Sequence, residues 1–187
     1  TAAGKVTEAS VATLEAQLYT KEADKVKEMI AVLDVNNIDA AAVKAAREAY
    51  DALNEDYQFG GSYYDKLVAL EKTLAGNADE NAKAYVQDLS IAVRTAKVGK
   101  KVKVTVKADV QTLIDNGYTV TYKFYKSTKK GSGYKNTVNK TTNTYTNTNP
   151  VKGKNYYKVK LVVKNADGAV VATTPLTQCK YGVRTIK

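Results

Sequence analysis

Lysines and tyrosines alternate with apolar residues in two stretches of this chain. Lys123 and Tyr125 lie on either side of Phe124. In a second stretch, apolar residues alternate with Tyr156, Lys158, Lys160 and Lys164. Alternation of period two predicts strands with one buried and one exposed face. Aligned cations with aromatic rings between them can bind an anionic polymer. The alternative interpretation is an ordinary solvated lysine face that keeps the protein soluble.

Residues for catalysis or metal binding are scarce. The chain has no histidine and one cysteine, Cys179, so it can form neither an internal disulfide nor a zinc site of cysteines and histidines. Cys179 lies in an alternating stretch, and we expect a small buried side chain there. The acidic loops at residues 34–39 and 55–56 lack EF-hand spacing. We therefore expect no enzymatic activity, no metal and no cofactor.

Charge divides the chain into two halves. Residues 1–89 carry 9 basic and 16 acidic residues, a net charge of −7, whereas residues 90–187 carry 20 basic and 3 acidic residues, a net charge of +17. Alanine is concentrated in the first half and threonine in the second. Because alanine favours helix and threonine favours strand, we predict an α+β protein of two domains that meet near residue 90.

The first half predicts an acidic, antiparallel bundle of helices. Val26, Met29, Ile30 and Leu33 follow the helical period, and an earlier set, Val11, Leu14 and Leu18, begins the same helix or forms a separate one. Asp39 is a suitable N-cap for a helix over residues 40–53. A third helix starts near Ser62 and is predicted to end at Gly76-Asn77. Residues 80–89 form either a further short helix or a connection.

The second half predicts a β-sandwich. Apolar residues alternate with polar ones over residues 102–108, 120–125 and 157–163. Residues 165–168, Asn-Ala-Asp-Gly, predict a hairpin turn. About seven short strands separated by turn signals favour two packed antiparallel sheets. We expect helix to be confined to about residues 7–89 and strand to residues 90–187.

Three motifs in the second half resemble the bacterial fibronectin type III-like domain. They are YKFYKSTKKGSGY at 122–134, TYTNT at 144–148 and KGKNYYKV at 152–159, and their order is that of the third, fifth and sixth strands of the family. The tryptophan usual in the second strand is missing, and the corner before Tyr156-Tyr157 is one residue short. By alternation we expect Tyr157 to face inward.

The motif AAAVKAAREAYDAL at 40–53 is similar to the three-helix FIVAR modules that are repeated in large surface proteins of Gram-positive bacteria, with a core over about residues 20–75. Together the two resemblances imply a secreted or cell-surface protein of several domains. No run of apolar residues is long enough to span a membrane.

In a fibronectin-like sandwich the third and sixth strands are neighbours, and the last strand pairs with the sixth. The resemblance therefore places eight residues on one face: Lys123, Tyr125, Tyr156, Lys158, Lys160, Lys164, Lys180 and Arg184. We expect this face to bind an anionic cell-wall polymer or polysaccharide, such as teichoic acid or a sulfated glycan, in preference to nucleic acid. The alternative function is a structural spacer or stalk that presents a distal catalytic or adhesive domain of the same protein.

Overall fold

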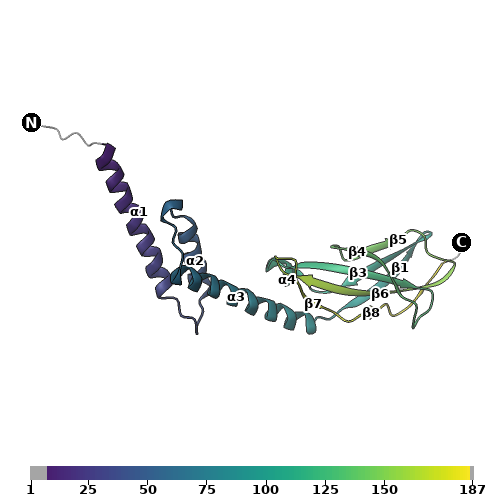
Figure 1. Ribbon diagram of the computed structural model, residues 1–187. Coiled ribbons are helices and arrows are strands. Elements are labelled where there is room, and N and C mark those ends of the chain that lie inside the picture. The colour runs from purple at the N-terminus through teal and green to yellow at the C-terminus, as the bar shows by residue number, and fades with distance from the viewer. Residues whose placement is uncertain (1–7, 186–187) are drawn as a thin grey trace, which may run out of the picture. The chain divides into compact units, whose positions relative to one another are not determined.

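The computed structural model describes the backbone of residues 8–185 and the side chains of residues 8–183 (Figure 1). The described chain divides between Asn77 and Ala78 into two compact units. Helices build the first unit, and antiparallel sheets build most of the second, so the predicted α+β fold class is confirmed. Among the helices of residues 8–185, none has the length and hydropathy that crossing a membrane requires.

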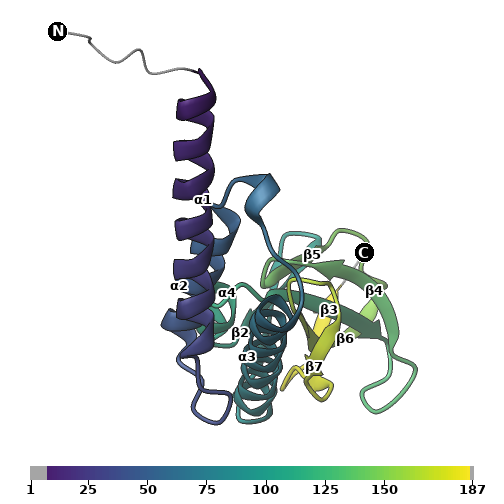
Figure 2. The same cartoon turned by 60° about the vertical axis from the view of Figure 1, so that its left-hand side comes forward.

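The helical unit consists of two helices, a 3-10 turn and the first part of a long third helix: α1 (Glu8–Ala31), α2 (Ala40–Asp51), η1 (Glu55–Tyr57) and α3 (Ser62–Gln87). Asp39 caps α2 as predicted, because its Oδ1 accepts hydrogen bonds from the backbone N–H groups of Ala41 and Ala42. In both views α1 and α2 lie side by side (Figures 1 and 2).

A small apolar core holds the helical unit together. α1 supplies Val26 and Ile30, and Leu33 follows the end of this helix. These three share one cluster with residues from α2, the following loop and α3: Val43, Ala46, Tyr50, Leu53, Leu67 and Leu70. The earlier set of Val11, Leu14 and Leu18 belongs to the same helix but stays 42–62% exposed. α1 has 24 residues and α2 only 12, so the shorter helix covers only part of the longer one.

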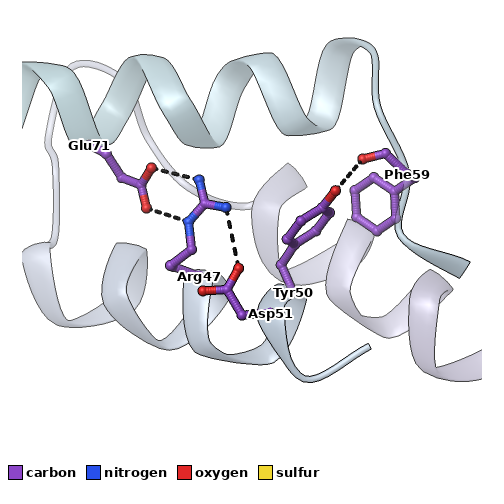
Figure 3. Close-up of polar contacts among 5 residues, drawn as sticks. All are labelled: Arg47, Tyr50, Asp51, Phe59 and Glu71. Atoms are coloured by element: carbon purple, nitrogen blue, oxygen red, sulfur yellow. Dashed lines mark hydrogen bonds and ion pairs between the residues drawn. The ribbon is translucent and has the colours of Figure 1, made fainter. Parts of the chain in front are cut away.

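Arg47 of α2 and Glu71 of α3 form a two-point ion pair (Figure 3). Arg47 Nε and Nη2 each donate a hydrogen bond of 2.7 Å to one carboxylate oxygen of Glu71, and Nη1 lies 3.6 Å from Asp51 Oδ1. The guanidinium lies 5.5 and 5.4 Å from the ring centroids of Tyr50 and Tyr64. The hydrogen bond to Glu71 raises the pKa of Arg47 above its ordinary value. Two parallel N–H···O bonds fix both distance and orientation, so this pair holds α2 against α3.

The third helix is longer than the sequence predicts. The predicted end at Gly76-Asn77 is wrong, since α3 continues without interruption to Gln87. Gly76 is not among the glycines with positive φ, so it does not adopt the left-handed conformation that ends helices. Beyond it, Ala82 and Val86 are buried in the core of the second unit. That burial offsets the roughly 1 kcal/mol that a glycine costs inside a helix.

The second unit contains two antiparallel sheets. Their strands are β1 (Ala92–Val98), β2 (Lys101–Lys107), β3 (Thr119–Ser127), β4 (Lys135–Lys140), β5 (Thr144–Asn147), β6 (Gly153–Lys164), β7 (Val170–Thr173), β8 (Thr177–Gln178) and β9 (Val183–Thr185). One sheet has the order β1-β2-β5, and the other has the order β4-β3-β6-β7, with β8 and β9 also pairing with β6. The third and sixth strands are therefore neighbours and the last strands pair with the sixth, as the resemblance to fibronectin type III domains implies.

The inner faces of the two sheets form the sandwich core. Fully buried side chains alternate along β2 (Val102, Val104, Val106) and β6 (Tyr157, Val159, Leu161, Val163), which confirms both predicted patterns. Tyr157 faces inward as predicted. Cys179 is 2% exposed, and its sulfur accepts a hydrogen bond of 3.3 Å from the Tyr157 N–H. This low exposure confirms the expectation of a small buried side chain, and the burial raises the pKa of the Cys179 thiol.

The last turns of α3 and a short helix complete the second unit. Asp79 of α3 accepts hydrogen bonds from the Tyr118 hydroxyl at 3.0 Å and from Asn165 Nδ2 at 2.9 Å. Helix α4 (Gln111–Asp115) connects β2 to β3 and buries Leu113. The expectation that residues 90–187 hold no helix is wrong here, because five residues supply too short a helical pattern to stand out from the strands around it.

Candidate ligand-binding face

Four of the eight predicted site residues lie directly beside one another on β3 and β6. The register of these strands places Lys123 opposite Lys160 and Tyr125 opposite Lys158. Side chains opposite each other in an antiparallel pair point to the same side of the sheet. All four are half-buried. We call these four residues the lysine–tyrosine face.

The turn between β3 and β4 covers part of this face. Lys158 Nζ lies 4.4 Å from the ring centroid of Tyr134, which is a close cation–π contact. The Tyr134 hydroxyl and Gln178 Nε2 both donate hydrogen bonds to the Lys130 carbonyl, at 2.8 and 2.9 Å. Burial raises the pKa of Tyr134 to about 12. The turn is therefore tied to β8. It places Tyr134 against the lysine–tyrosine face, to which the sequence analysis did not assign this residue.

Two asparagines extend the same side of the sheet onto β4. Asn139 is opposite Lys123, and Asn136 is opposite Tyr125 after a bulge. Asn136 Nδ2 donates a hydrogen bond of 3.1 Å to Asn139 Oδ1. Sequence analysis did not predict these two residues, because β4 lacks a clear alternation and its bulge shifts the pattern by one residue.

Tyr156 packs against the segment that follows β8. A β-carbon at Gly182 would lie 2.6 Å from Tyr156 Cε1, so only a glycine leaves room for the ring. Lys180 is exposed in this segment, with Nζ 5.4 Å from the ring centroid of Tyr181. Tyr156 and Lys180 therefore belong to the end of the sheet where the last strands begin.

The remaining two predicted residues lie elsewhere. Lys164 is opposite Thr119 near the other end of β6 and is separated from Lys160 by the buried Val162. At about 3.4 Å per residue, its backbone is roughly 14 Å from that of Lys160. The backbone of Arg184 in β9 is opposite Lys154, and its side chain lies outside the described residues. The structure thus brings together the centre of the predicted face but not Lys164.

The sandwich has almost no neutralising charge. In the stretch 90–183, whose side chains are described, no lysine or arginine forms an ion pair, and the recorded pairs all lie within residues 24–83. The sandwich sequence offers only Asp109, Asp115 and Asp167 as partners. Repulsion between Lys123 and Lys160 is therefore not relieved by a carboxylate.

Nothing in the described residues forms a metal site, because no three side chains of histidine, cysteine, aspartate or glutamate come together in the range 8–185. In the second unit, both carboxylate oxygens of Asp79 already accept hydrogen bonds, one from Tyr118 and one from Asn165.

Comparison with known proteins finds similarity to solved structures. No protein-family model matches the chain. No curated protein matches it either. Among solved structures, the chain is similar to an Fn3-like protein from Clostridium thermocellum, with 22% sequence identity, a TM-score of 0.34, and coverage of 51% of this chain and 94% of that one. Since no family model matches the helical unit, its resemblance to FIVAR modules stays a prediction.

Proposed function

We propose that this chain binds an anionic glycan or cell-wall polymer through the lysine–tyrosine face. The observation that carries the proposal is the placement of Lys123 directly opposite Lys160, with no carboxylate partner for either among the residues that the structure describes. Like charges directly opposite each other on neighbouring strands destabilise a sheet. An anionic group bound between the two ammonium groups would relieve that repulsion, so the free energy lost in folding is recovered on binding.

The neighbouring groups suit a sugar-based polymer better than a bare ion. Tyr125 and Tyr134 offer ring surface beside the lysines, and Asn136 and Asn139 offer amides that both donate and accept hydrogen bonds. The net charge of +17 on residues 90–187 would attract a polyanion from a distance before these contacts form.

The proposed setting is a non-catalytic module of a larger secreted or wall-attached bacterial protein, and the resemblance to surface-protein modules supports it. The second proposed role, a spacer or stalk for a distal domain, needs no ligand. Binding measurements separate these roles.

The test is the affinity of the full chain for heparin and for purified teichoic acid, measured across a salt series, with neutral dextran as a comparison. We expect both anionic polymers to bind and dextran to bind weakly. Replacing Lys123 and Lys160 together by glutamine should lower affinity for the anionic polymers. The slope of log affinity against log salt should become shallower by about 1–2, because two fewer cations release counterions.

A matched control lies on the other sheet. Lys101 and Lys103 of β2 are exposed and two residues apart, so replacing them by glutamine makes the same charge change away from the lysine–tyrosine face. We expect this double variant to retain nearly all of the affinity. Equal losses in the two double variants would show that binding depends on overall charge. Absence of binding to either polymer would leave the spacer role.

A further inference from the structure

A concave site lies within the sandwich unit, away from the lysine–tyrosine face. A cavity of about 330 Å³ is formed by the last turns of α3 together with α4 and the residues just before β3. Five of its lining residues carry polar groups: Asn81, Tyr85, Thr112, Asn116 and Tyr118. This volume is at the lower end of the range of about 300–1,000 Å³ typical of small-molecule sites.

The lining of this cavity contrasts with the rest of the sandwich surface. None of its lining residues is charged, although residues 90–187 carry 20 lysines and arginines. It offers two phenol rings, two amides and one hydroxyl, and its remaining lining is alanine from α3. Such a set recognises a ligand by apolar contact and neutral hydrogen bonds, not by charge.

Hydrogen bonds hold the two rings in place without a ligand. The Tyr118 hydroxyl donates to Asp79 Oδ1 at 3.0 Å, and the Tyr85 hydroxyl donates to the Asp109 carbonyl at 3.1 Å. Both phenol oxygens keep the capacity to accept a hydrogen bond. Groups that are fixed before binding lose little conformational entropy when a ligand arrives, which favours affinity.

The amides in the cavity are only partly used. Asn116 Nδ2 donates to the Thr112 carbonyl at 2.9 Å, which orients this amide and leaves its oxygen free to accept. Asn81 makes no side-chain hydrogen bond to any residue that the structure describes. The cavity therefore presents a free amide, a free amide oxygen and two phenol oxygens around one space.

We propose that this cavity binds a neutral sugar ring. The C–H faces of a sugar pack against tyrosine rings, and its hydroxyl groups donate to and accept from amides and phenols. An anionic sugar fits poorly. Tyr118 donates its hydrogen bond to the negatively charged Asp79, and no cation lines the cavity to offset a second negative charge. The ligand class is thus the opposite of that proposed for the lysine–tyrosine face.

The test uses the full chain and a panel of neutral saccharides: glucose, galactose, mannose, N-acetylglucosamine, cellobiose, lactose and chitobiose. Saturation-transfer NMR identifies binders, and calorimetry measures their affinity at low and high salt. We expect saturable binding of at least one saccharide in the millimolar range, with little dependence on salt. Glucuronic acid should bind more weakly than glucose.

Two variants locate the binding. Asn81→Ala removes the free amide from an exposed helical position and should weaken binding about three- to tenfold, the loss expected for one neutral hydrogen bond. Ala78→Leu fills the space from an exposed position of the same helix and should abolish binding. Both alanine and leucine favour helix, so neither variant should unfold the chain.

The matched control is Asn149→Ala, which removes an exposed amide outside the cavity and should leave affinity unchanged. Replacing Lys123 and Lys160 by glutamine should also leave saccharide binding unchanged, which separates this site from the proposed polymer site. Failure of every saccharide in the panel to bind would overturn the proposal. Binding that persists equally in Asn81→Ala and Ala78→Leu would overturn it too.

Discussion

The side chains of Asn147 and Tyr157 join the two sheets through a hydrogen bond inside the core. Asn147 Nδ2 donates to the Tyr157 hydroxyl oxygen at 2.8 Å, with Asn147 only 3% exposed and Tyr157 fully buried. Asn147 Oδ1 accepts a hydrogen bond of 3.2 Å from the backbone N–H of Asn149. Asn147 ends β5 and Tyr157 lies in β6, so one amide links the sheets and also shapes the following turn.

Replacing Tyr157 by phenylalanine should destabilise the sandwich by about 1–3 kcal/mol, because the Asn147 amide would stay buried without its acceptor. Urea unfolding followed by circular dichroism measures the change. Tyr181→Phe is the control, since Tyr181 is 70% exposed and should tolerate the change. In an Asn147→Ala background the Tyr157→Phe change should cost less. Equal costs in the two backgrounds would contradict an energetic role for the bond.

Replacing Glu71 by glutamine should destabilise the helical unit by about 1 kcal/mol, because the two-point pair with Arg47 loses its charge and one of its acceptors. Arg47→Lys should not preserve the stability, since an ammonium cannot make two parallel bonds. Thermal unfolding of the helical signal checks both. Lys44→Gln is the matched control, because Lys44 and Glu48 are 77% and 67% exposed and their pair should contribute almost nothing.

Replacing Gly76 by alanine should stabilise the chain by about 0.5–1 kcal/mol. Gly76 lies inside α3 without positive φ, and a β-carbon there would meet no atom within 4 Å. Chemical denaturation measures the gain. The control is Gly133→Ala, which should destabilise because Gly133 has a φ of +69°. A loss of stability in Gly76→Ala would show that α3 does not continue through this position.

The stability of the sandwich should fall in alkaline solution. Burial raises the pKa of Tyr157 and Cys179, and raises that of Tyr134 to about 12. Groups with a higher pKa in the folded state bind protons more tightly there, so their contribution is complete below their unfolded pKa of about 10 for tyrosine and is lost as pH rises further. Unfolding free energies measured from about pH 8 to pH 12 should therefore decline above pH 9.

A phenylalanine variant isolates one of these groups. Tyr134→Phe lacks the phenol that titrates near pH 12, so its stability should decline less steeply than that of the unmodified chain at the alkaline end. Its lost hydrogen bond to the Lys130 carbonyl shifts all values equally and does not affect the slope. Identical slopes in the two proteins would rule out Tyr134 as a contributor.

Period and composition were enough to predict the main elements. Alternation along β2, β3 and β6 predicted which side chains are buried, because a strand has only two faces and the apolar face is buried away from water. Asp39 predicted the start of α2, because an N-cap is a local interaction between residues close in sequence. The inward position of Tyr157 followed from the same alternation.

Tertiary packing determined the features that local sequence patterns could not predict. Gly76 is a local signal for a helix end, but burial of Ala82 and Val86 in the sandwich keeps α3 intact. Strand pairing, which joins residues far apart in sequence, placed Lys123 opposite Lys160 and left Lys164 apart. Tyr134 reached Lys158 only because a turn folds back over the sheet. The cavity beside Tyr85 and Tyr118 likewise exists only once α3 and α4 meet, since no single segment contains its walls.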